Sequence, residues 1–254
     1  MTNKLVFPEQ DDNTIVELPP YTLTDMVLGG EGIDQDMLEP HEIKEHNLKI
    51  RLAHTGERVG SASLLVKKMY HKIGYDIPDM HHSQDRITLI ASQNNAVVGT
   101  LTLGLDANNG LLADQNYKLE IDHLREKGNN VCELTKFAVD QTRGSKRVLA
   151  ALFHIAYIYG RVLQKQTDVV IEVKPKHASF YKRLLGFEQI GPERLNSRVN
   201  TRGVLLWLEI NYVEHQIDLW GGKTEEAKGE RSLYPYFFSK QDEVGITQRL
   251  LQYE

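Results

Sequence analysis

Apolar and polar residues alternate in the first half of the chain in a way that predicts a strand and a hairpin. The run LKIRLA at 48–53 has the two-residue period of a half-buried strand. Two longer runs, at 87–93 and 96–105, flank Asn94 and Asn95. Asparagine tolerates the positive φ that a tight hairpin turn requires, so we expect two antiparallel strands there.

Three later segments predict further strands. Residues 130–140, NVCELTKFAVD, alternate like the earlier strands. The run DVVIEVK at 168–174 is nearly continuous and rich in β-branched residues, and such strands tend to be buried on both faces. The segment VLLWLEINY at 204–212 predicts a final strand.

Three segments have the spacing of amphipathic helices. The first covers 62–73, the second is the long segment 146–165, and the third, 177–187, ends at Gly186. The section at 106–129 is rich in Asp, Asn and Gly, and we expect a loose connection there. The predicted order of elements is therefore β, α, β, β, β, α, β, α, β.

The 254 residues are enough for one domain with its own core, and the composition changes along the chain. Residues 1–47 hold eleven acids and two bases among several prolines and glycines, which predicts an acidic arm that docks in part. We expect the main domain at 48–212 and a C-terminal helical extension at 213–254. The chain has no apolar stretch of about 18 residues and its start does not resemble a secretion signal, so we expect a cytoplasmic protein with no membrane span.

Beyond the acidic arm the chain is basic, with 28 bases against 24 acids. Nine bases fall within 143–183, where the only acids are Asp168 and Glu172. This cluster is either a solvated helix face or a docking patch for a negatively charged partner. No helix-turn-helix, zinc finger or aromatic-basic pattern supports nucleic acid as that partner.

Few residues point to metal or thiol chemistry. Cys132 is the single cysteine, which excludes an internal disulfide and a cysteine zinc cluster. It lies in a strand-like run, where we expect a small buried apolar side chain rather than a nucleophile. The ten histidines include no pair with the spacing and adjacent acid of a zinc protease motif, so we expect no metal.

The segment between the predicted strand at 130–140 and the predicted helix at 146–165 has the features of a phosphate loop. The free N–H groups at a helix start, together with the positive end of the helix dipole, bind phosphate without a special side chain. Gly144 lets the backbone approach a ligand closely. The alternative is a surface turn that caps a core helix.

This strand, loop and helix resemble the GNAT superfamily of N-acetyltransferases. The family loop reads Gln or Arg, two residues, Gly, one residue, then Gly or Ala, and Gln141 and Gly144 match it while Lys146 departs from it. FYKRLLGF resembles the family's helix-to-strand signature, and the elements at 48–212 follow the family order. The resemblance implies an α/β (α+β) fold with a mixed, mostly antiparallel sheet, flanking helices and a splayed central pair of strands.

The resemblance also implies how an acyl thioester would bind. The strand before the loop would expose the edge from Phe137 through Ala138 to Val139 to the pantetheine arm. The loop residues that would hold its phosphate are Gln141, Arg143, Gly144, Ser145 and Lys146. The long side chain of Lys146 crowds the loop, which favours a donor with one phosphate over an adenine nucleotide.

CELTKFAV resembles the ELSRF strand of acyl-homoserine-lactone synthases and, more closely, the strand of bacterial N-acyl amino acid synthases. The resemblance covers about residues 50–250 for the amino acid synthases and only the middle third of the chain for the lactone synthases. Lys136 replaces the arginine of the lactone synthases, and lysine does not reproduce a bidentate guanidinium contact. Both groups typically take long acyl chains from acyl carrier protein. The resemblance therefore implies an N-acyltransferase that moves a long acyl chain from carrier phosphopantetheine, or less favourably from acyl-CoA, to the α-amine of an amino acid. No cofactor would stay bound, and the product would associate with membranes.

The same resemblance assigns candidate residues. Glu133 would orient or deprotonate the amine, or else form a structural salt bridge with Lys136; Tyr181 would protonate the thiolate, or else only pack. We expect substrate contacts from Lys136, Met69 and Leu101, the apolar ones lining an acyl tunnel unless they are plain core. We expect carrier contacts from Arg147, Lys174, Lys176, Lys182 and Arg183. The alternatives are an acetyl-CoA acetyltransferase, a lactone-synthase-like enzyme and a non-enzymatic carrier-binding module.

Overall fold

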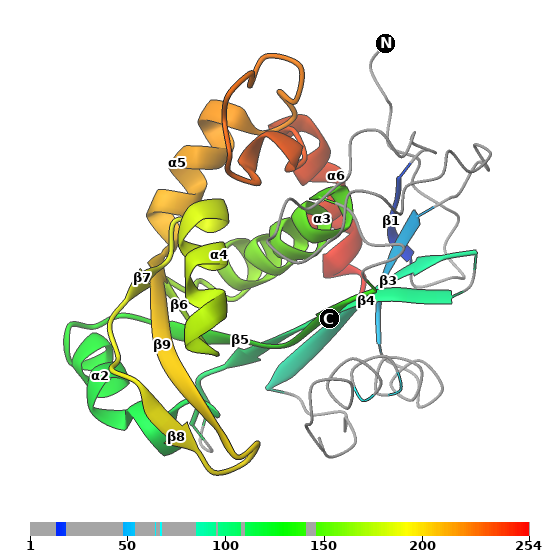
Figure 1. Ribbon diagram of the computed structural model, residues 1–254. Helices are drawn as coiled ribbons and strands as arrows, with labels where there is room; N and C mark the ends of the chain where they lie inside the picture. The colour runs from blue at the N-terminus through cyan, green and yellow to red at the C-terminus, as the bar shows by residue number, and fades with distance from the viewer. Residues whose placement is uncertain are drawn as a thin grey trace, which may run out of the picture.

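The computed structural model describes residues 14–18, 48–53, 64, 67, 85–94, 96–107, 110–140 and 146–253. Within these residues, nine strands form one sheet in the order β1-β2-β3-β4-β5-β6-β9-β7, and β8 pairs with β9 (Figure 1). The strands are β1 Thr14–Leu18, β2 Leu48–Leu52, β3 Arg86–Gln93, β4 Ala96–Leu105, β5 Val131–Val139, β6 Asp168–Val173, β7 Glu188–Gln189, β8 Arg194–Asn196 and β9 Thr201–Glu209. All these pairs are antiparallel except β5 with β6. The predicted mixed, mostly antiparallel sheet is confirmed.

Helices cover both faces of this sheet. The helices are α2 Asp114–Glu126, α3 Lys146–Tyr157, its π-helical continuation η4 Ile158–Leu163, α4 Pro175–Leu185, α5 Ile210–Trp220, the short 3-10 helix η5 Tyr234–Tyr236 and α6 Lys240–Leu251. Figure 1 shows α3, α4, α5 and α6 on one side of the sheet and α2 on the other. Of the helix expected at 62–73, residues 64 and 67 are helical, and the rest lies outside the described residues.

Two apolar clusters lie on the two faces of the sheet. The larger one surrounds α3, whose residues 148–157 are all buried. On the other face, α2 packs Tyr117, Ile121 and Leu124 against the sheet. Because β6 lies between the clusters, Val169 and Ile171 are buried on one face and Val170 on the other, as the run of β-branched residues predicted.

Local backbone signals also agree with the sequence. Residue Asn94 has a φ of 49° in the turn between β3 and β4, so the hairpin expectation is confirmed. Gly186 has a φ of 85° and ends α4. A β-carbon at Gly186 would also lie 2.4 Å from the Tyr212 ring, so this position excludes a side chain on two grounds.

Three expectations about secondary structure were wrong. Helix α2 occupies the section that was expected to be loose. Its apolar residues Tyr117, Ile121 and Leu124 have helical spacing and pack against the sheet, although charged residues surround them in sequence. Residues 14–18 of the acidic arm form β1 at the sheet edge rather than irregular chain. The strand expected at 204–212 ends at Glu209, since Ile210, Val213 and Ile217 are buried on one face of α5.

Candidate active site

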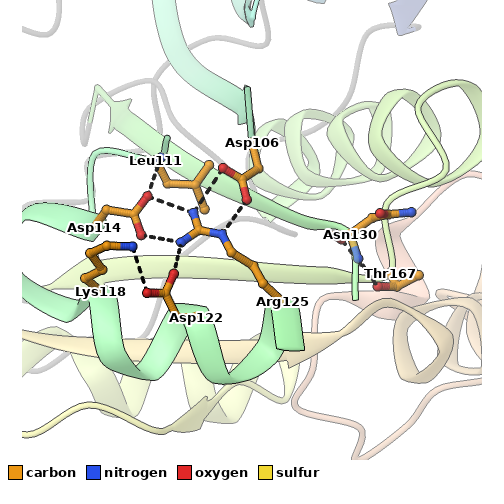
Figure 2. A network of polar contacts seen from close by, with 8 residues as sticks. All are labelled: Asp106, Leu111, Asp114, Lys118, Asp122, Arg125, Asn130 and Thr167. Atoms are coloured by element: carbon orange, nitrogen blue, oxygen red, sulfur yellow. Dashed lines mark hydrogen bonds and ion pairs between the residues drawn. The ribbon is translucent and has the colours of Figure 1, made fainter. Parts of the chain in front are cut away.

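The parallel pair β5 and β6 is joined at one end and open at the other. Their ladder contains only Val131–Asp168, Cys132–Val169 and Glu133–Val170. Before it, Asn130 N donates to Thr167 Oγ1 and Thr167 N donates to Asn130 O, both at 2.9 Å (Figure 2). Beyond Glu133 the register with β6 ends, although β5 continues to Val139. The predicted splayed strand pair is therefore present.

A β-bulge lies in the open part of β5. Between Thr102–Thr135 and Thr100–Ala138 the ladder with β4 gains one extra residue on β5. Lys136 has a φ of 50° there, and its carbonyl accepts a 2.9 Å hydrogen bond from Thr100 Oγ1. A residue with a side chain in this left-handed backbone conformation costs about 1 kcal/mol or more, and such backbone strain clusters at functional sites. The extra residue directs Phe137 toward α3, where its ring lies 5.2 Å from that of Phe153.

Glu133 occupies the last paired position before the strands part. Its side chain is 2% exposed, and Oε2 accepts a 2.7 Å hydrogen bond from Leu112 N. Burial raises the pKa of Glu133 to about 7. A carboxyl with this pKa is available as a base near neutral pH. The salt bridge considered as an alternative, to Lys136, is not among the ion pairs of the described residues.

A polar network positions the donor to Glu133. Arg125 on α2 binds three aspartates, and Asp114 also accepts a 2.7 Å hydrogen bond from Leu111 N (Figure 2). The aspartates are Asp106, Asp114 and Asp122, with ion-pair distances of 2.6, 2.7 and 2.6 Å. This network fixes the backbone beside Leu112, so it holds the amide that faces Glu133. The sequence indicated neither the network nor Leu112, because both depend on contacts between distant segments.

Tyr181 and Phe137 meet beside the open strand edge. Tyr181 is buried on α4, and its ring lies edge-on to Phe137 with 6.4 Å between ring centroids. Ala138 is buried and Val139 is half-buried on the same strand. The structure thus brings together the predicted pantetheine edge and the candidate acid. Their chemical roles stay predictions.

An apolar cavity of about 50 Å³ lies on the face that carries α3, beside Cys132 and Leu134, where β5 begins to part from β6. Its walls come from β4, β5, α3, η4, β6, the end of α4, β9, α5 and the C-terminal segment, and include Cys132, Leu134, Phe153, Gly160, Tyr234 and Phe237. The buried Cys132 thiol has a raised pKa, so it serves as an apolar wall and not as a nucleophile. Sequence reasoning missed the other five, because their apolar positions look like ordinary core.

The remaining predicted substrate and loop residues are placed as follows. Leu101 is fully buried in the large cluster and is not among the residues that line the cavity. Met69 and four of the loop residues lie outside the described residues, namely Gln141, Arg143, Gly144 and Ser145. Lys146 begins α3, and its ammonium lies 5.4 Å from the centre of the Tyr236 ring, which is a cation–π contact.

Four of the five predicted carrier contacts lie on or next to α4. Lys176, Lys182 and Arg183 are exposed, while Lys174 immediately before the helix is half-buried. Burial and the nearby charge of Lys176 lower the pKa of Lys174. The fifth, Arg147, is half-buried on α3.

Neither a metal cluster nor a membrane span is found in the described part of the chain. No group of three or more histidine, cysteine, aspartate or glutamate side chains within it is arranged to hold a metal ion. None of its helices is long and apolar enough to cross a bilayer. The site therefore contains titratable side chains, backbone and an apolar cavity.

Comparisons with known proteins agree with this geometry. The family model described as N-acyl amino acid synthase FeeM matches residues 61–209. The solved structure of FeeM, an N-acyl amino acid synthase from uncultured soil microbes, is 25% identical with a TM-score of 0.60, over 65% of this chain and 92% of that one. A search of curated proteins finds no match.

Two other solved structures give weaker likenesses. The acyl-homoserine-lactone synthase LasI is 16% identical with a TM-score of 0.48, over 65% of this chain and 90% of that one. A putative N-acetyltransferase from Lactobacillus plantarum is 14% identical with a TM-score of 0.48, over 64% and 98%. At these scores neither adds to the assignment, which depends on the family model and the FeeM structure. The chain belongs to the FeeM family of N-acyl amino acid synthases and is an N-acyltransferase.

Proposed function

We propose that the enzyme transfers a long acyl chain from the phosphopantetheine of acyl carrier protein to the α-amine of an amino acid. The observation that supports this most is the arrangement around Glu133. Side chains alternate along β5, so Cys132 and Leu134 face the apolar cavity while Glu133 faces the opposite side of the sheet. A thioester at the open edge of β5 would then have its acyl chain on one face and the attacking amine on the other.

The reaction follows from these positions. The amine attacks the thioester carbonyl as Glu133 accepts a proton from it, and a C–N bond forms. Backbone N–H groups on the open edge of β5 stabilise the oxyanion of the tetrahedral intermediate. The C–S bond then breaks, and Tyr181 gives a proton to the departing thiolate. No covalent acyl-enzyme is needed, because positioning and charge stabilisation suffice for direct transfer.

The charge distribution favours a carrier protein as donor. Lys176, Lys182 and Arg183 present three cations on the exposed side of α4, the helix that also carries Tyr181. Carrier protein is acidic, so opposite charges would guide its docking next to the open strand edge. Surface charges are screened over about 8 Å at physiological ionic strength, so this association should weaken with salt.

The cavity constrains the acyl chain. Its volume of about 50 Å³ accommodates about three to five groups of the size of a water molecule. A long chain therefore requires the far wall to move, and that wall includes Tyr234 and Phe237 of the C-terminal segment. This wall lies beyond residue 209, where the match to the family model ends.

A direct assay tests the proposal. The purified protein is mixed with amino acids and with either a long-chain acyl carrier protein or the matching acyl-CoA, and products are identified by mass spectrometry. We expect N-acyl amino acids, formed faster from the carrier. Glu133→Gln should abolish most product, whereas Glu126→Gln on the exposed side of α2 should not. Product formed only from acetyl-CoA on other amines, or equal turnover by Glu133→Gln, would contradict the proposal.

A further inference from the structure

Polar residues line one part of the sheet face onto which Glu133 projects, where β3, β4 and β5 lie side by side. Directly opposed residues on neighbouring strands share a face. One such row runs from Arg86 on β3 over Gly104 on β4 to Glu133 on β5. The next row contains three threonines, and all three lie on this face. They are Thr88, Thr102 and Thr135.

Arg86 lies within reach of Glu133. The side chain is half-buried, and a β-carbon at Gly104 would lie 3.8 Å from both Arg86 Cγ and Glu133 O. Gly104 thus leaves room for the arginine stem to cross β4. The two residues are two strands apart, about 10 Å at the backbone, a gap that an arginine side chain covers.

Lys136 is half-buried and directly follows Thr135 on β5, at the end of the threonine row. Burial lowers the pKa of Lys136, and the positive charge of Arg86 lowers it further. Within the described residues, neither cation forms an ion pair with a carboxylate. Half-buried cations without an ion-pair partner are stabilised by a bound anion. Arg86 and Lys136 thus supply positive charge that the carboxylate of a small ligand would complement.

Two further groups suit an amino acid. Thr135 Oγ1 is buried and has no hydrogen-bond partner among the described residues. Its place next to Glu133 leaves a donor or acceptor beside the base. An arginine fork binds a planar carboxylate through two parallel hydrogen bonds. Arg86 on β3 thus offers a binding group for a carboxylate, and Glu133 and Thr135 on β5 offer binding groups for an amine, with β4 between them.

We propose that Arg86, assisted by Lys136, binds the α-carboxylate of the acceptor amino acid, while Glu133 and Thr135 hold its α-amine. The inference depends on the proposed function, since it assumes that the acceptor is an amino acid. It assigns to Arg86 the selection of amino acids over amines that lack a carboxylate. The side chain of the acceptor would then point away from the sheet.

Steady-state kinetics on matched acceptors test this assignment. The acceptors are the amino acid that gives most product, its methyl ester and its decarboxylated amine. The wild type should prefer the amino acid. Arg86→Gln should raise the KM for the amino acid about 10- to 100-fold, leave the KM for the acyl donor unchanged and remove the preference. The KM of Arg86→Lys for the amino acid should lie between those of the wild type and Arg86→Gln, because lysine keeps the positive charge but lacks the guanidinium fork.

Arg202→Gln is the control, since this arginine is exposed on the β8–β9 hairpin and should leave all three acceptors unaffected. Thermal unfolding of each variant shows whether it is folded. If Arg86→Gln still prefers the amino acid as the wild type does, the assignment is wrong while acyl transfer stands.

Calorimetry separates this outcome from a failure of the proposed function. If the wild type makes no N-acyl amino acid, the proposed function fails. Titration of the free amino acid into the wild type and into Arg86→Gln then tests the carboxylate subsite by itself. At least tenfold weaker binding by Arg86→Gln supports the subsite. Equal binding, or no binding by the wild type, overturns it.

Discussion

Replacing Glu133 by glutamine changes the pH dependence of stability in a direction that the structure fixes. Burial raises the pKa of Glu133 from 4.5 to about 7. Between these pH values the folded protein holds a proton on Glu133 that the unfolded chain has lost. The stability conferred by this proton is therefore fully present below about pH 4.5 and is lost as the pH rises to about 7.

The size of this effect follows from the two pKa values. Their difference corresponds to about 3 kcal/mol of unfolding free energy. Glutamine keeps an oxygen that accepts the hydrogen bond from Leu112 N, but it has no proton to lose in this range. Relative to Glu133→Gln, the wild type should become less stable by about 3 kcal/mol between pH 4 and pH 8.

Urea unfolding of both proteins, followed by circular dichroism at several pH values, measures this difference. Groups common to both proteins cancel in the comparison, and Glu126→Gln serves as an exposed control. In activity assays, the wild-type kcat/KM should rise with pH around pH 7, and the variant should lose about 100- to 10,000-fold. A stability difference that does not change with pH would refute the buried, proton-holding state of Glu133.

Three further predictions concern the cavity, the polar network and the charged helix. Phe237→Ala should shift the products to longer acyl chains, measured by mass spectrometry, because it opens the far wall of the cavity; an unchanged chain-length profile would count against the acyl site. Arg125→Met should lower both the unfolding free energy, by about 2 kcal/mol, and the rate of acyl transfer, because it breaks three ion pairs beside the amide that donates to Glu133. Lys118→Met is the control, since it breaks one exposed ion pair and should lower the unfolding free energy by under about 0.5 kcal/mol. Reversing the charges of Lys182 and Arg183 to glutamate should weaken carrier binding and its salt dependence while the rate with acyl-pantetheine stays unchanged, as binding and turnover assays will show.

The elements that position the site were mostly predictable, because their patterns are local. The Asn94 turn, the long helix from Lys146 and the buried run of β6 each follow from a few neighbouring residues. The boundary between β9 and α5 was less clear, since the apolar residues near Ile210 satisfy both the strand and the helix period. Sequence patterns therefore fixed element types better than their ends.

The parts of the site that were missed depend on long-range contacts. Helix α2 carries its apolar residues at Tyr117, Ile121 and Leu124, but charged neighbours dilute that signal. The bulge at Lys136 has no marker in sequence, because its positive φ arises from the pairing with β4 and occurs in a lysine rather than a glycine. The hydrogen bond from Leu112 to Glu133 spans 21 residues and follows only from the docking of α2.

The most direct test concerns the open edge between β5 and β6. Amide hydrogen exchange is measured by mass spectrometry with and without an acyl-phosphopantetheine that carries no carrier protein. The account predicts added protection on β5 beyond Glu133, in the segment from Thr135 to Val139, where the ladder to β6 has ended. Protection that appears elsewhere and leaves this segment unchanged would contradict the claim that the donor binds between the parted strands.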